Sequence, residues 1–314
     1  MSKKMKTNTD NILDLDVLIN QTTDLVSQQE MFLTNILVVD IDELVGEVSS
    51  LMSLPEIYLK IRKLMDDPDS SLEDFADVVN TDPGLLALVL KIVNSAYYGF
   101  SGQIDNIKRA LNLIGIGQLH DLVLSLSALN SLDLSNDIET LQQFWQRSIY
   151  CGVLSRLLAK KLKLEDAESL FIIGLLHEVG HLILFVKYPQ ESRLSVNQAQ
   201  KENISLLGVE RRNFGTDYGK VGQALMAEWK LPLKFQSIIG HQLEPDNATE
   251  FIQETAIVHI AHQASVNKYP GADSFRYEMD EDLLLTINTT EEELNDLYEA
   301  ANDISREMER LIFG

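Results

Sequence analysis

The sequence predicts an all-α protein built as a two-lobed helical bundle, and three observations support this prediction. Apolar residues recur three and four positions apart over most of the 314 residues, as they do on one face of a helix, instead of alternating as in a strand. Seven prolines and sixteen glycines are few for this length, so helical runs are seldom interrupted. Residues that favour helix starts recur between the apolar runs.

The order of apolar and polar stretches predicts four segments. Residues 1–45 form an acidic, moderately apolar N-terminal extension. Residues 46–130 contain several short amphipathic segments with brief connections, as in a compact N-terminal helical lobe. The polar stretch DLSNDIETLQQ separates this lobe from a second helical lobe in residues 140–270, and residues 271–314 form a C-terminal helical tail.

Helix signals punctuate the first lobe. Ser70, followed three residues later by Glu73, predicts a capping box, and Asp82 precedes a proline at the expected first helical position. Asp105 is expected to cap the next helix, and Gly115 to end it. These signals predict four or five short helices in this lobe.

One stretch of the second lobe is apolar on nearly all sides, and the tail is amphipathic. The stretch AESLFIIGLLHEVGHLILFV has a wider apolar face than a surface helix needs, so we expect it at the centre of a core. The tail helix should begin at Thr289 or Thr290, and its apolar residues keep a heptad spacing. We expect this short seam to pack back onto the body and not to form a coiled coil.

Composition limits the function classes that remain. The formal net charge is −22, and an acidic surface repels nucleic acid and anionic membranes, so we expect neither as a direct partner. The first residues contain no apolar secretion signal, and no later window approaches roughly 20 uninterrupted apolar residues. With Cys151 as the single cysteine, these features predict a cytoplasmic protein with a buried, reduced thiol.

The sharpest local motif is His177-Glu178-Val179-Gly180-His181, which matches H-E-x-x-H. This spacing places two histidines one helical turn apart and suggests a zinc protease. The glycine inside the motif, the apolar flanks and the lack of a marked third ligand argue against that interpretation.

The same residues resemble a different family. GLLHEVGHLIL resembles the GLLHDIGxLxL segment of HD-superfamily proteins, and the stretch from LPEIYLKIRKLM to VNSAYYG is similar to the N-terminal half of the HDOD family. RALNLIGIGQLHDLVLSLS, FWQRS, EWKLP and GHQLEPD with VHIAHQA follow in the family's order, so the resemblance covers about Leu51 to Ser265. It implies a helical first lobe and a degenerate HD-like second lobe. The Asn94-Ser95 landmark in the first lobe is expected to cap backbone groups.

The resemblance also implies where a metal centre would lie. HD phosphohydrolases bind divalent metals through histidines and aspartates that activate a water molecule against a phosphoester. Carried over one position at a time, the ligand positions fall in order on Arg147, His177, Glu178, Tyr218, His241 and His262. Arginine thus stands at the first ligand position, glutamate replaces the dyad aspartate, and histidine replaces the distal aspartate.

A guanidinium at the first ligand position opposes a divalent cation, because arginine stays protonated in proteins. We therefore expect no bound cofactor and no catalysis. Arg147 and Tyr218 are altered cleft positions, and Arg147 is expected to pair with Glu178. The family implies a binding or scaffold protein of bacterial signal transduction, with a protein partner or a small ligand in the old cleft.

The alternative is a metal-dependent phosphohydrolase with a remodelled site. Four side chains remain chemically able to bind a divalent metal ion: His177, Glu178, His241 and His262. Both hypotheses require Arg147 and these four residues to converge in one cleft.

Overall fold

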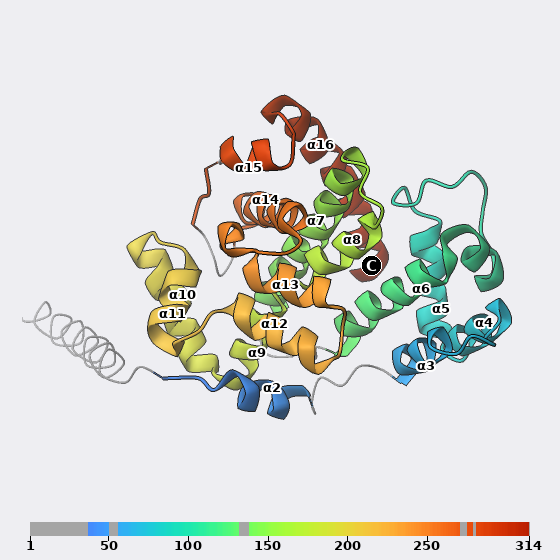
Figure 1. The fold of residues 1–314 in the computed structure, drawn as a ribbon, viewed down its shortest axis with the longest axis horizontal. Coiled ribbons are helices and arrows are strands. Elements are labelled where there is room, and N and C mark those ends of the chain that lie inside the picture. Colours follow the sequence, from blue (N-terminus) through green and yellow to red (C-terminus); the bar gives the residue numbers. More distant parts are fainter. Residues whose placement is uncertain (1–36, 50–55, 132–137, 271–274, 279–280, 314) are drawn as a thin grey trace, which may run out of the picture.

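The computed structural model describes residues 37–49, 56–131, 138–270, 275–278 and 281–313, and every regular element in them is helical (Figure 1). The all-α prediction is therefore confirmed for the described part of the chain. The helices of the first lobe lie together on one side of the molecule (Figure 1). They are α3 (Glu56–Met65), α4 (Leu72–Asn80), α5 (Pro83–Val93) and α6 (Ile107–Ser131).

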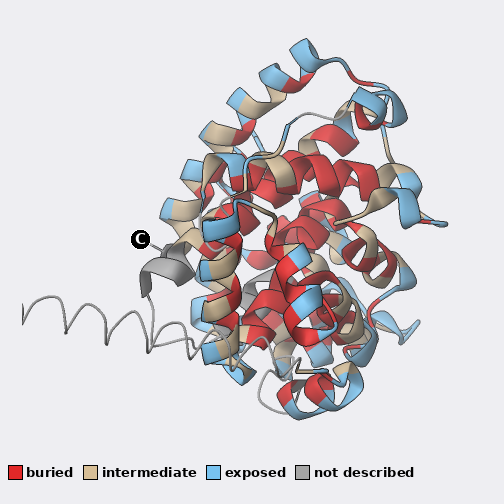
Figure 2. Ribbon diagram, turned by 90° about the vertical axis from the view of Figure 1, so that its left-hand side faces the viewer, coloured by how far each residue is buried: buried red, intermediate tan, exposed pale blue. Residues whose placement is uncertain are grey.

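The second lobe is larger and has the most buried centre (Figure 2). Its helices are α7 (Ile138–Lys161), α8 (Ala167–Leu176), α9 (Val179–Lys187), α10 (Pro189–Glu202), α11 (Leu206–Phe214), α12 (Tyr218–Glu228), α13 (Leu233–His241) and α14 (Ile252–Lys268), with the 3₁₀ turn η1 (Pro245–Asn247) before α14. Helix α8 packs against α7, and α14 packs against both. These three helices form the frame of the lobe.

Three further helices, from the two ends of the chain, also pack on this body. Helix α2 (Ile41–Ser49) contacts α9 and α12 of the second lobe, although it precedes the first lobe in sequence. The tail contributes α15 (Glu281–Thr286) and α16 (Glu291–Phe313), and α16 packs on α7 and α5, as expected for a tail that folds back. Most of the predicted N-terminal extension, residues 1–36, lies outside the described residues.

The capping predictions were correct in kind, and two of them were displaced by one residue. The capping box of α4 is formed by Ser71 and Asp74, because Ser71 is the residue in extended conformation next to the helix. Asp82 caps α5 as predicted and accepts from two backbone amides. Before α6, the side chain of Asn106, and not Asp105, accepts from the amide of Arg109.

Two other predicted helix boundaries, a stop at Gly115 and a start at Thr289 or Thr290, can be compared with the structure. Gly115 interrupts α6 with φ 83° and ψ 162°, so the predicted stop is a kink within one longer element. In the tail, the Thr290 hydroxyl accepts from the amide of Glu293, whose carboxylate returns to the Thr290 amide. Thr290 therefore caps the start of α16.

The apolar stretch around the histidines was expected to form one helix, but the structure divides it into two. Helix α8 ends at Leu176 and α9 begins at Val179, so His177 and Glu178 lie at a break. The span Ala167–Lys187 is long and apolar enough to cross a membrane, but 89% of its most apolar window is buried inside the protein. It forms the centre of the second lobe, as in the core of a globular domain.

Helices α7 and α8 touch backbone to backbone through two glycines. A Cβ atom on Gly174 would lie 2.7 Å from the Gly152 Cα, and a Cβ atom on Gly152 would lie 2.6 Å from the Phe171 carbonyl oxygen. Both distances are shorter than van der Waals contact, and both clashing atoms belong to the backbone. Only glycine at these positions permits this separation of the helices.

This contact predicts opposite effects for two Gly→Ala substitutions. Gly174→Ala should lower the free energy of unfolding by about 1–3 kcal/mol, because the added methyl group overpacks the contact. Gly208→Ala is the matched control, since Gly208 is exposed in α11 and its Cβ would meet no atom within 4 Å. Alanine there should be neutral or stabilise by up to about 1 kcal/mol. Urea denaturation of both variants measures these changes, and equal effects would contradict the close contact.

Candidate functional site

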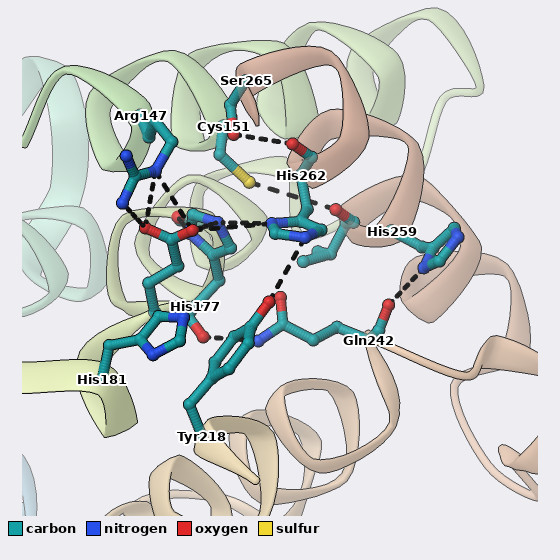
Figure 3. A network of polar contacts seen from close by, with 12 residues as sticks. Arg147, Cys151, His177, His181, Tyr218, Gln242, His259, His262 and Ser265 are labelled. Carbon is teal, nitrogen blue, oxygen red and sulfur yellow. Dashed lines mark hydrogen bonds and ion pairs between the residues drawn. The ribbon is translucent and has the colours of Figure 1, made fainter. Parts of the chain in front are cut away.

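Side chains from three helices and the α8–α9 break meet in the interior of the second lobe (Figure 3). Arg147 comes from α7, Tyr218 from the start of α12 and His262 from α14, while His177 and Glu178 occupy the break. All five are buried, with exposed fractions of 0–3%. We call these five residues the cluster.

The strongest interaction in the cluster joins Arg147 to Glu178. Arg147 Nε lies 3.2 Å and 3.0 Å from the two Glu178 oxygens, and Arg147 Nη2 lies 2.9 Å from Oε2. This is the ion pair expected from the sequence. Burial alone would raise the pKa of Glu178, but Arg147 and, after it, the neighbouring His177, His181 and His262 together outweigh burial and lower the pKa to about 2. Glu178 is therefore a carboxylate with both oxygens engaged.

A chain of hydrogen bonds runs through the two histidines. His177 Nδ1 lies 2.6 Å from the Gly174 carbonyl oxygen, which can only accept, so this nitrogen donates. In the neutral ring His177 Nε2 then accepts, and it lies 3.1 Å from His262 Nδ1. His262 Nε2 in turn accepts from the Tyr218 hydroxyl at 3.3 Å. The chain is complete with both imidazoles neutral.

Burial keeps these histidines neutral at ordinary pH. Desolvation lowers the pKa of His177 to about 4, although the Glu178 carboxylate acts in the opposite direction. Burial and the neighbouring His177 place the pKa of His262 well below its ordinary value. The carboxylate thus takes its counter-charge from Arg147 and not from a protonated imidazole.

The donor types at this site suit a divalent metal ion, but their arrangement does not. Ligand atoms of His177, Glu178 and His262 all lie within 4.8 Å of one another. However, both carboxylate oxygens bind Arg147, and the two imidazoles are bonded to each other. An incoming cation would have to break these bonds beside a fixed positive charge. The residues as arranged therefore do not fit a metal ion.

The second histidine of the H-E-x-x-H motif belongs to a different interaction. His181 Nδ1 lies 3.0 Å from Oε1 of Glu210 on α11, and its ring stacks on Tyr218 with centroids 3.7 Å apart. The helix break directs His181 away from the His262 side of the cluster (Figure 3). A zinc protease requires both motif histidines to face one metal ion. His177 and His181 point to different partners, so they do not form such a site.

The His181–Glu210 pair retains a proton. Burial opposes protonation of His181, but the Glu210 carboxylate raises the net pKa of this imidazole. Burial also raises the pKa of Glu210, against the effect of His181, and Glu210 accepts from the Tyr218 amide at 2.9 Å. Sequence reasoning missed Glu210, although it lies on the buried stripe of α11 with Leu206 and Val209.

The close packing of α9 on α12 explains why the motif contains a glycine, Gly180. A Cβ atom there would overlap the carbonyl of Tyr218, so glycine permits α9 and α12 to touch. This contact brings the Tyr218 ring onto His181 and its hydroxyl to His262.

His241 lies apart from the contacts of the cluster. It is the last residue of α13, is half-buried, and its Nδ1 bonds to the Ser237 carbonyl at 2.8 Å. Among the described residues, no hydrogen bond or ion pair joins it to the cluster. The next residue does make that contact, because Gln242 Nε2 donates to the His177 carbonyl oxygen. The structure thus brings Arg147, Tyr218 and three of the four candidate ligands together.

A surface hollow of about 350 Å³ lies close to the cluster. Its lining consists of Leu243, Glu244, Pro245, Asp246, Asn247, His259 and Leu283. His259 Nδ1 bonds to the Gln242 carbonyl oxygen, and the Gln242 side chain bonds to His177 (Figure 3). The hollow is therefore connected to the cluster through two residues.

Solved structures of other proteins share this fold. A protein of Shewanella amazonensis SB2B, provisionally named a phosphohydrolase, is similar with a TM-score of 0.67 and 22% identity, over 86% of this chain and 97% of that one. An HDOD domain protein of unknown function from Geobacter sulfurreducens gives 0.68 and 20%, over 86% and 96%. A protein of Marinobacter aquaeolei VT8, provisionally named for signal transduction, gives 0.69 and 18%, over 92% and 65%. At these identities the likeness shows the fold.

Sequence comparison gives the family. An uncharacterized protein of Treponema pallidum (strain Nichols) is 29% identical over 177 residues, which cover 55% of this chain and 34% of that protein. The match thus spans about a third of that relative's length. The family model of the HDOD domain matches residues 51–245, well over half of the chain. The chain therefore belongs to the HDOD domain family.

Proposed function

We propose that this protein is a non-catalytic signal-transduction protein, which acts by binding a partner and not by hydrolysing a phosphoester. One observation carries the proposal: the Arg147 guanidinium engages both oxygens of Glu178, at a position that resembles the first metal ligand of HD phosphohydrolases. The charge that a metal ion would supply there is supplied by the chain itself. Neither a metal nor another cofactor is required for this arrangement.

The closed geometry of the cluster supports the same proposal. Metal-assisted hydrolysis needs an open coordination position and a water molecule that reaches it. The cluster side chains are 0–3% exposed, and hydrogen bonds or an ion pair join Arg147 to Glu178, His177 to His262 and His262 to Tyr218. A substrate would have to open the core before it met these groups.

The hollow next to the cluster is the better place for a small ligand. It is open to the surface, and His259 and Gln242 connect it to His177. The net charge of −22 disfavours nucleic acid and anionic membranes. We therefore assign to this protein a cytoplasmic protein partner in a signalling pathway, with a small ligand as a second input.

The rival function is a phosphohydrolase with a remodelled metal site. It is favoured by the ligand atoms of His177, Glu178 and His262, which lie within 4.8 Å of one another. A two-histidine, one-carboxylate set can hold zinc or iron if the competing bonds are released. Metal analysis separates the two functions.

Protein purified without chelator should contain no stoichiometric divalent metal and show no phosphodiesterase or phosphatase activity above background with Mn²⁺, Fe²⁺, Mg²⁺ or Zn²⁺. The matched variant Arg147→His/Glu178→Asp/His262→Asp returns the family's ligand types and should bind metal in the same analysis. Wild-type metal at one ion per chain, with turnover that is lost in Glu178→Ala, would contradict the proposal.

The ion pair predicts a second result, on stability. Arg147→Met should lower the free energy of unfolding by about 3–5 kcal/mol, because it leaves a buried carboxylate without its counter-charge. The double variant Arg147→Met/Glu178→Met should recover most of that loss. Arg212→Met is the control, since the Arg212–Glu202 pair is exposed by 51% and 40%, and it should change stability by less than about 1 kcal/mol. Chemical denaturation measures all three. A double variant less stable than Arg147→Met would contradict the charge argument.

The neutral histidines predict a third result, on pH dependence. His177 has a pKa of about 4 in the fold against 6.5 ordinarily, and His262 is lowered too, so the unfolded chain takes up protons first as pH falls. The free energy of unfolding should fall between pH 6.5 and 4, by up to about 1.4 kcal/mol per pH unit for each histidine. His181 has a raised pKa, so its contribution to stability is fully present below pH 6.5 and is lost as the pH rises above 6.5 through the pKa of the folded state.

Urea denaturation at several pH values checks this dependence. His177→Gln should flatten the slope between pH 6.5 and 4 by about one proton. The slope of wild type should persist in the presence of EDTA. An unchanged slope in His177→Gln would show that this imidazole is not held neutral.

A further inference from the structure

A second buried arginine–glutamate pair joins the same two helices at the boundary between the lobes. Arg156 of α7 donates from Nε to Glu168 Oε1 at 2.7 Å, and Glu168 lies in the first turn of α8. Tyr97, from the loop after α5 of the first lobe, donates its hydroxyl to Glu168 Oε2 at 2.8 Å. Arg156 Nη1 donates to the Tyr97 carbonyl oxygen at 2.9 Å, and its guanidinium lies 3.8 Å from the Tyr97 ring centroid. We call these three residues the seam triad.

Each member of the seam triad contacts the other two, and all are largely buried. Arg156 and Tyr97 are each 4% exposed, and the Glu168 side chain is 14% exposed. Such a closed set of charged hydrogen bonds favours one geometry, because the loss of any contact leaves a largely buried polar group with fewer partners. The seam triad therefore reports the relative position of the first lobe, α7 and α8.

The loop that carries Tyr97 is fixed to the first lobe. Asn94 both donates to and accepts from the backbone of Ile104, each at 2.7 Å. The Ser95 hydroxyl donates to the Ile92 carbonyl oxygen, in keeping with the capping role expected for the Asn94-Ser95 landmark. From the tail, Glu307 of α16 accepts from the Ala96 amide. A displacement of Tyr97 must therefore displace the end of α5.

The two arginine–glutamate pairs lie on opposite sides of the Gly152–Gly174 contact. Along α7 the order is Arg147, Gly152, Arg156, and along α8 and the break it is Glu168, Gly174, Glu178. Because the two backbones touch at the glycines, a tilt of one helix about this contact displaces both of its ends. Such a tilt changes the geometry of both ion pairs.

We propose that the seam triad couples the cluster to the first lobe through the α7–α8 pair, so that a change at Arg147 and Glu178 is transmitted to the loop of residues 94–104. This inference rests on the proposed function only in taking the cluster as a regulatory and not a catalytic site. Its product is a change in the dynamics of a surface loop that also contains the partly exposed Phe100. A signal received in one lobe is thereby presented on the other.

Hydrogen–deuterium exchange of the full chain tests this coupling. Glu178→Gln, which weakens the distant ion pair, should speed exchange of peptides covering residues 94–104 by about tenfold, a common size for coupling between sites. Tyr97→Phe removes only the hydroxyl that binds Glu168 and should speed exchange of the same peptides. Adding Glu178→Gln to Tyr97→Phe should then change the exchange by less than about twofold, because the route is already broken.

The control is Leu206→Ala, which destabilises a separate small core of Ala199, Leu206 and Val209. It should leave the exchange of residues 94–104 unchanged. If Glu178→Gln does not fold, Arg147→Lys supplies the same perturbation with the positive charge retained. Metal analysis of wild type decides the proposed function independently. The coupling is overturned if the cluster variants leave the loop unchanged, if they act equally with and without the Tyr97 hydroxyl, or if Leu206→Ala speeds exchange as much.

Discussion

The backbone contact between α7 and α8 is the constraint on which the rest of the second lobe depends. Gly152 and Gly174 bring the helices closer than any larger residue would allow. At this separation arginines on α7 can reach glutamates associated with α8 on both sides of the contact. Helix α14 then packs against both helices and supplies His262. The glycine contact thus sets the helix separation at which both ion pairs form.

The break between α8 and α9 gives the cluster its polar character. A continuous helix would bury the backbone groups of residues 177 and 178 in intrahelical bonds and stack the motif histidines on one face. At the break, the His177 carbonyl oxygen instead accepts from Gln242, and the Glu178 side chain turns toward α7. His181 is left to pair with Glu210. A short departure from helical geometry therefore separates two polar sites within an apolar segment.

The helical class, most of the helix caps and the Arg147–Glu178 pair could be predicted from the sequence. These features depend on local chemistry or on a position that matches the family. The helix break could not be predicted, since apolar periodicity continues through it without a proline. Sequence reasoning also placed His241 in the site, where Gln242 makes the contact. A one-residue difference at a helix end changes which side chain points inward, and the residue types alone do not determine where the helix ends. Glu210 could not be identified from the sequence, because its partner His181 lies on another helix and only the fold brings the two together.

The Arg147–Glu178 pair also limits how this protein can change over evolution. Replacing Arg147 by a metal-binding residue leaves Glu178 charged in the core until an ion arrives, and replacing Glu178 first leaves Arg147 buried without its carboxylate. Either first step costs about 3–5 kcal/mol, a large fraction of the roughly 5–15 kcal/mol by which a domain is stable. A return to metal chemistry therefore needs two coordinated substitutions, or a stabilising change elsewhere beforehand. The cost of breaking the ion pair therefore preserves the closed site, even when no selection for regulation is acting.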